Sequence, residues 1–178
     1  MSFTRRQILG GLAGLVVVGV GAGGASRYWL GKMADADAGH DYELIAAPLD
    51  VELVPGHKTE AWAFGPSAPG TELRVRQGEW LRVRFINHLP VATTIHWHGI
   101  RLPLEMDGVP YLSQLPVQPG EYFDYNFICP DAGSYWYHPH TASTEQLGRG
   151  LVGPLIIEER EPSGFRHERT LSLKTWHI

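Results

Sequence analysis

Two His-x-His pairs carry the clearest chemistry in this sequence, His96-Trp-His98 and His138-Pro-His140. Each pair lies beside β-prone sequence, where residues i and i+2 point to the same face, about 6–7 Å apart along the strand. Imidazole is a good ligand for copper, zinc, iron and nickel. Because four of the nine histidines fall in these two short motifs, the pattern predicts a metal site rather than unrelated core or surface histidines.

The elements that must position these histidines are short β-strands. Polar and apolar residues alternate through several segments, which are separated by glycine and proline. Only residues 144–147 suggest a helical turn. The fold class expected is all-β, a sandwich or Greek-key barrel. The expected strands are 42–54 (broken around Pro48), a hairpin over 72–87 that turns at 77–79, and 93–98, 121–129, 134–138 and 151–158.

On this framework the histidines should leave the core on one side of the sheet. Ile95 and Trp97 would pack inward while His96 and His98 face the other way. Proline cannot donate a ladder hydrogen bond, so Pro139 places the second pair at a strand end. Strand ends are where ligands can point into a shared cleft.

Composition excludes some functions. The formal net charge is −4 and the isoelectric point is about 6.1, so nothing favours nucleic acid as a partner. Cys129 is the single cysteine, so no internal disulfide can form. We expect this cysteine to be buried and structural.

The first 38 residues differ from the rest. Thr4-Arg-Arg-Gln-Ile-Leu9 precedes a mildly apolar, glycine-rich run, a pattern that resembles a twin-arginine export signal. A membrane anchor is the alternative, because about 20 uncharged residues can span a bilayer. Residues 1–38 are therefore expected to be a twin-arginine-type signal or anchor, with the protein exported to the periplasm and either released or membrane-anchored.

Several motifs occur together in one order. They resemble the first, plastocyanin-like (cupredoxin) domain of a multicopper oxidase, of the laccase or bacterial copper-efflux type. The resemblance implies a cupredoxin-like Greek-key fold for residues 39–160, with residues 161–178 a stub of a second cupredoxin domain. The motifs are Thr94-Ile-His-Trp-His-Gly99, Asp107-Gly-Val-Pro110, Gln118-Pro-Gly120, Gly133-Ser-Tyr-Trp-Tyr-His-Pro-His140 and Gly150-Leu-Val-Gly-Pro-Leu-Ile-Ile157.

The resemblance also implies roles for single residues. His96 would bind the type 2 copper, His98 and His138 one type 3 copper, and His140 the other. Asp107 would supply protons while dioxygen is reduced to water, although an Asp-Gly pair is also a common turn. The neighbouring residues Trp97, Trp136 and Tyr137 are expected to shape and orient the site rather than react.

The family's remaining ligands are not found in this sequence. Cys129 is followed by Pro130 and by no histidine within eight residues, so a blue type 1 copper site does not fit. The five other histidines match neither of the family's C-terminal histidine motifs. The chain is therefore expected to be a truncated or split oxidase that holds half of the trinuclear cluster.

Three functions follow from this interpretation. The first is a component of an oxidase that couples oxidation of a small phenolic or cuprous substrate to reduction of dioxygen, with a complementing C-terminal half or a homo-oligomer as partner. The second is a non-catalytic periplasmic copper-binding module. The third, a zinc site of four histidines with hydrolytic activity, lacks a general base beside the pairs.

Overall fold

The computed structural model describes residues 39–161 and 164–176. The expected signal or anchor over residues 1–38 lies outside the described residues and stays a prediction. Within the described part, no helix has the length and apolar character needed to cross a membrane.

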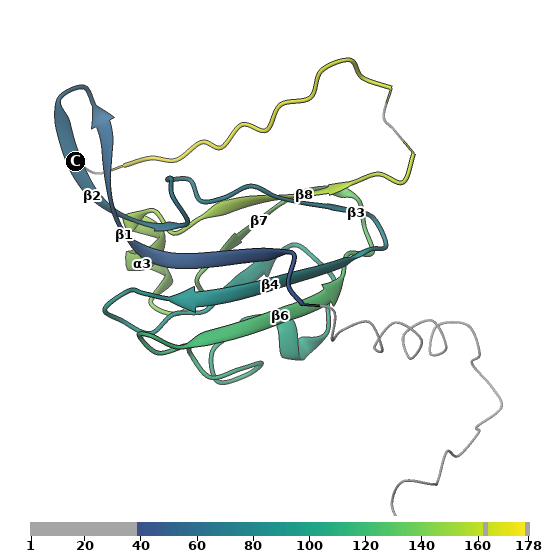
Figure 1. The fold of residues 1–178 in the computed structure, drawn as a ribbon, viewed down its shortest axis with the longest axis horizontal. Helices are drawn as coiled ribbons and strands as arrows, with labels where there is room; N and C mark the ends of the chain where they lie inside the picture. Colours follow the sequence, from purple (N-terminus) through teal and green to yellow (C-terminus); the bar gives the residue numbers. More distant parts are fainter. Residues whose placement is uncertain (1–38, 162–163, 177–178) are drawn as a thin grey trace, which may run out of the picture. The chain divides into compact units, whose positions relative to one another are not determined.

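The described residues form two mixed four-stranded sheets, joined by loops (Figure 1). Sheet A has the order β2-β1-β4-β6, and sheet B has the order β3-β8-β7-β5. This arrangement confirms the all-β expectation and is consistent with a cupredoxin β-sandwich. The elements are β1 (Tyr42–Val54), β2 (His57–Phe64), β3 (Leu73–Arg76), β4 (Trp80–Asn87), β5 (His96–His98), the 3-10 turn η1 (Leu104–Met106), β6 (Tyr122–Ile128), β7 (Gly133–His138), α3 (Ser143–Arg149) and β8 (Gly153–Glu158).

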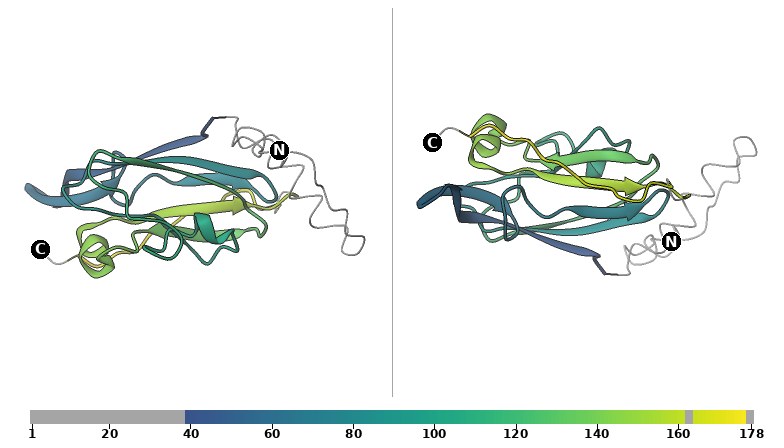
Figure 2. Two further views of the ribbon diagram at one scale, coloured as in Figure 1. Left: turned by 90° about the horizontal axis from the view of Figure 1, so that it is seen from below. Right: turned by 90° about the horizontal axis from the view of Figure 1, so that it is seen from above.

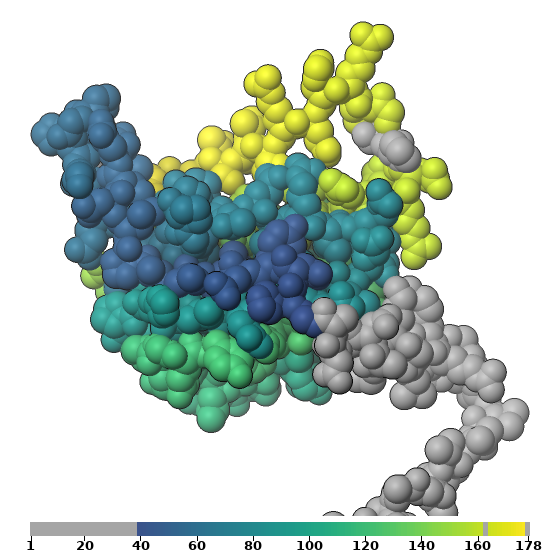
Figure 3. All heavy atoms as spheres, viewed as in Figure 1, coloured from purple at the N-terminus to yellow at the C-terminus, as the bar shows by residue number. Residues whose placement is uncertain are grey.

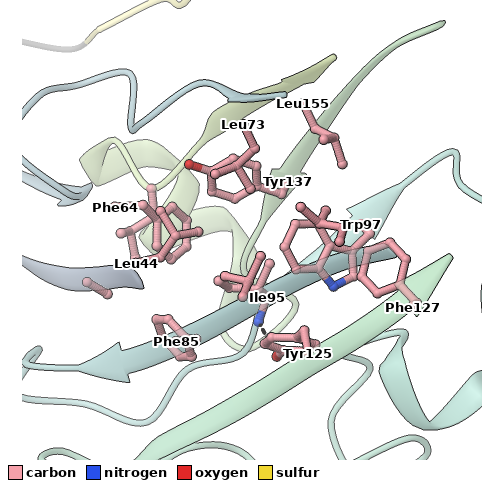
Figure 4. Packing of buried hydrophobic residues seen from close by; sticks show 14 of the residues in the cluster. Leu44, Phe64, Leu73, Phe85, Ile95, Trp97, Tyr125, Phe127, Tyr137 and Leu155 are labelled. Carbon is pink, nitrogen blue, oxygen red and sulfur yellow. Dashed lines mark hydrogen bonds between the residues drawn. The ribbon is translucent and has the colours of Figure 1, made fainter. Parts of the chain in front are cut away.

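The hydrophobic core lies between the two sheets, which form two layers in the views of Figure 2. Trp97 of β5 packs against Tyr125, Phe127 and Tyr137, with ring centroids 5.1–5.7 Å apart. The backbone N–H of Ile95 donates to the Tyr125 hydroxyl at 2.9 Å (Figure 4). Ile95 and Trp97 are fully buried, so the prediction that they face the core while the histidines face away is confirmed.

The predicted hairpin over residues 72–87 is wrong. Both strands exist, but β3 pairs in parallel with β8, whereas β4 pairs in parallel with β1 and antiparallel with β6. The turn between them crosses from one sheet to the other, since Gln77 N–H donates to Glu158 and Gly78 N–H donates to Cys129. Alternation identifies each strand, but it does not identify the neighbour with which the strand pairs.

The predicted break at Pro48 is also wrong, because β1 continues through it. Pro48 lies opposite Trp62 in the β1–β2 ladder. On its other side β1 pairs with β4 only over Tyr42–Ala46. Pro48 therefore stands where that second edge is open, and its missing N–H costs no ladder hydrogen bond.

The C-terminal segment, residues 164–176, forms neither helix nor strand and runs beside β3 and β8 of sheet B (Figure 1). The yellow spheres of Figure 3 show this segment on the surface of the domain. Lys174 Nζ donates to the Leu147 carbonyl of α3 at 2.7 Å. Leu171 and Leu173 are 84% and 96% exposed. That this segment opens a second domain stays a prediction.

Candidate metal centre

The two His-x-His motifs meet because β5 pairs with β7 in antiparallel fashion. His96 lies opposite His138, Trp97 opposite Tyr137, and His98 opposite Trp136. Residues that face each other across a ladder share a face of the sheet. Sheet B therefore has Trp97 and Tyr137 on its core face, and a two-by-two block of His96, His98, His138 and Trp136 on its other face.

Three imidazoles of this block form a compact cluster. His96, His98 and His138 each place a ring nitrogen within 4.8 Å of the other two. Nδ1 of His98 and Nε2 of His138 lie 3.2 Å apart. Imidazole–metal bonds are about 2.0–2.1 Å, so two nitrogens on one ion are expected about 3 Å apart. The observed spacing fits two ligands of a single ion.

His138 is held in the neutral form that binds metals. Its Nδ1 donates to the Pro139 carbonyl at 2.9 Å, which leaves the Nε2 lone pair directed at His98. The imidazole is buried, and its pKa is lowered to about 4. Burial is the largest cause, the hydrogen bond to Pro139 opposes the shift, and the nearby imidazoles of His96, His98 and His140 add to it. At neutral pH the His138 imidazole is therefore uncharged, with its Nε2 lone pair available to a metal ion.

His96 is oriented by Asp107 from the loop that follows η1. Nδ1 of His96 donates to the Asp107 carbonyl at 2.8 Å and lies 3.2 Å from its carboxylate Oδ1. The Nε2 lone pair of His96 is thereby left free for a metal. The next residue, Gly108, has φ +71°, and a Cβ there would overlap the Ile95 carbonyl, so only glycine brings Asp107 this close.

His140 lies at the rim of the cluster. Its ring centroid is 5.2 Å from that of His96 and 6.4 Å from that of His138. It is not one of the three residues that meet within 4.8 Å. Its backbone N–H donates to Oγ1 of buried Thr94 at 3.3 Å, which fixes the chain where it leaves β7.

Sequence reasoning missed two supporting groups, the Pro139 carbonyl and the Thr94 hydroxyl. Thr94 stands two residues before His96 in the same motif, and that position was the available signal. The contact of Pro139 runs through its backbone, which its residue type does not reveal. Cys129 is buried, and burial raises the pKa of its thiol to about 12, in agreement with a structural role.

Comparisons with known proteins agree with this geometry. The sequence family described as multicopper oxidase matches residues 47–162, which is more than half of the chain. Copper resistance protein A of Pseudomonas syringae pv. tomato is 36% identical over 97% of this chain and 29% of its own length. Copper resistance protein A of Escherichia coli is 33% identical over 98% of this chain and 28% of its own length.

Solved structures extend the same similarity. The multi-copper oxidase of Pseudomonas thermotolerans superimposes with a TM-score of 0.77 at 78% identity, over 78% of this chain and 34% of that one. The enzyme of Pseudomonas parafulva gives 0.75 at 88% identity over the same shares. This chain spans about a third or less of the length of these relatives. The match of sequence family, fold and histidine cluster shows that the chain belongs to the multicopper oxidases, within whose length it corresponds to an N-terminal domain.

Proposed function

We propose that this chain is a Greek-key cupredoxin domain that supplies half of the histidine ligands of a trinuclear copper cluster, where dioxygen is reduced to water. The observation that carries the proposal is the meeting of His96, His98 and His138 within 4.8 Å. Imidazole nitrogens suit copper, and the family match makes copper the metal expected here.

The geometry supports a division of roles among the histidines. His98 and His138, with nitrogens 3.2 Å apart, are assigned to one type 3 copper. His96 presents its Nε2 from the other end of β5 and is assigned to the type 2 copper. His140, at the rim, is assigned to the second type 3 copper.

Copper ions bound by these histidines would supply the one-electron steps that reduce dioxygen. The chain's own acid is Asp107, whose carboxylate lies beside His96 while its side chain is 29% exposed. A partly exposed carboxylate in that position can take a proton from solvent and release it on the side of the metal site. The carbonyl of the same residue holds the His96 ring in place, so Asp107 is proposed both to move protons and to orient a ligand.

The remaining ligands are proposed to come from a complementing C-terminal half or from a second copy of the chain, because a three-copper cluster needs more than four histidines. Dioxygen and a small phenolic or cuprous reductant are the proposed substrates of the completed enzyme. The twin-arginine-like start supports export to the periplasm. Residues 39–160 are retained as the first domain and 161–178 as the start of a second.

Copper titration of the full chain tests the ligand assignment. His98→Ala and His138→Ala should each weaken Cu²⁺ binding at least tenfold and reduce the nitrogen hyperfine structure in the electron paramagnetic resonance spectrum. His57→Ala is the matched control, because His57 is exposed on β2 and outside the cluster. Equal losses in all three variants, or a strong preference for zinc over copper, would overturn the assignment.

Measuring oxygen consumption distinguishes a component of an oxidase from a non-catalytic copper-binding module. We expect the copper-loaded chain alone to consume no oxygen with a phenol or cuprous substrate, and turnover to begin when a complementing C-terminal half is added. Turnover by the chain alone would contradict the half-site proposal. Copper binding that never leads to turnover with such a half would instead favour the module.

A further inference from the structure

The two-by-two block outside the core has one member that is not a histidine. Trp136 lies opposite His98 across the β5–β7 ladder and two residues before His138 on the same strand. It therefore occupies the fourth position of the block, on the same face as the three clustered histidines. It is half-buried, whereas Trp97, the neighbour of His98 in β5, is fully buried in the core.

The indole of Trp136 stacks on two imidazoles at once. Its ring centroid is 4.7 Å from that of His98 with planes 27° apart, and 4.2 Å from that of His138 with planes 26° apart. Imidazoles on opposite faces of the indole would be separated by nearly the sum of these two distances, but their centroids are only 5.4 Å apart. Both imidazoles therefore lie toward the same side of the indole.

The indole also forms a boundary. Trp136 lines a groove of about 450 Å³ between the outer face of sheet B and the segment that includes Leu171 and Leu173. The same side chain thus contacts both histidines and also lines this groove.

His98 needs this support more than His138 does. His138 is buried and its Nδ1 is fixed by the Pro139 carbonyl. His98 is exposed, and its ring contacts are with Trp136, His138 and His96. Rotation about the last side-chain bond of a histidine is soft. The indole face therefore fixes the plane of the His98 ring, while the 3.2 Å contact between Nδ1 of His98 and Nε2 of His138 sets the direction of the nitrogens within that plane.

We propose that Trp136 is a positioning residue that aligns His98 and His138 as a two-nitrogen pair for one copper ion. The proposal rests on the proposed function of the cluster. The indole binds no metal itself. It sets the planes of the two imidazoles, so the rings are already oriented before a copper ion binds and no free energy of binding is lost in ordering them. Groups that orient metal ligands in this way typically change affinity by about 10- to 100-fold when they are removed.

Three variants of the full chain test this role. Trp136→Leu removes the aromatic face, Trp136→Phe keeps a smaller one, and Trp80→Leu is the control, since Trp80 is also half-buried but stacks on Arg82 rather than on a histidine. In the copper-free protein, nuclear magnetic resonance should show the ring protons of His98 and His138 shifted upfield by the indole. That shift should vanish in Trp136→Leu, shrink in Trp136→Phe and persist in Trp80→Leu.

Copper affinity gives the decisive measurement. Trp136→Leu should weaken Cu²⁺ binding about tenfold or more, and its electron paramagnetic resonance spectrum should show several copper species. Trp136→Phe should recover most of the affinity and show a single copper species. Trp80→Leu should leave both unchanged, even if thermal unfolding shifts.

The two proposals fail in different ways. If His98→Ala and His138→Ala lose copper but Trp136→Leu binds as tightly as the unaltered chain, the positioning role is refuted and the ligand assignment stands. If the two histidine variants also bind copper normally, the proposed metal site is wrong. Equal losses in Trp136→Leu and Trp136→Phe would refute stacking as the cause.

Discussion

Replacing Gly108 by alanine should damage both the fold and the metal site. Gly108 has φ +71°, and a Cβ there would overlap the carbonyl oxygen of Ile95, directly before His96. The left-handed conformation costs an L-residue about 1–2 kcal/mol. The overlap must also push Asp107 away from His96, and losing their 2.8 Å hydrogen bond costs about 1 kcal/mol more. We expect a loss of about 2–3 kcal/mol in the free energy of unfolding and about tenfold weaker copper binding.

Gly120→Ala is the matched control for this prediction. Gly120 has φ +83°, but a Cβ there would meet nothing within 4 Å. Gly120→Ala should therefore show the conformational cost alone, about 1–2 kcal/mol, with copper affinity unchanged. Urea unfolding and a copper competition titration measure the two quantities. Equal destabilisation by both substitutions, with copper binding intact in both, would refute the claimed close approach at the metal site.

Three further predictions concern groups around the site. Tyr137→Phe removes the hydroxyl that donates to the Thr71 carbonyl; urea unfolding should show a loss of about 1–3 kcal/mol while copper affinity stays constant, because Tyr137 faces the core. Burial lowers the pKa of His138 from 6.5 to about 4, so in the copper-free chain the unfolded state takes up a proton between these pH values that the native state does not. The free energy of unfolding should then be fully present above pH 6.5 and fall by up to about 3 kcal/mol as the pH drops to 4, a slope that should be absent in His138→Gln. Burial raises the pKa of the Cys129 thiol to about 12, so a thiol reagent at pH 8 should label it at once in urea and only slowly in the native chain; fast native labelling would contradict its burial.

The local features of the site follow from the sequence. Alternation predicts that Ile95 and Trp97 enter the core and that His96 and His98 leave it, because strand residues alternate between faces. Pro139 predicts the end of β7, because proline cannot continue a ladder. Both predictions hold, since each depends only on neighbouring residues.

The features that depend on distant partners could not be predicted in the same way. The pairing of His98 with Trp136 is set by the β5–β7 register, and no period within either strand encodes it. The hairpin predicted over residues 72–87 fails for the same reason, because β3 finds its partner in β8 at the other end of the domain. A break predicted at Pro48 fails in the same way, because the open edge of β1 depends on where β4 ends.

The same distant pairings decide when the chain can first hold a metal ion during its synthesis. Leu73 of β3 pairs with Leu155 of β8, so sheet B stays incomplete until the last strand has left the ribosome. His96 and His98 emerge about forty residues before the strand that carries His138. Closing such long loops is slow compared with local folding. A copper ion that meets the nascent chain before β7 has emerged therefore finds only His96 and His98, and the three-histidine cluster becomes available only when β7 has paired with β5.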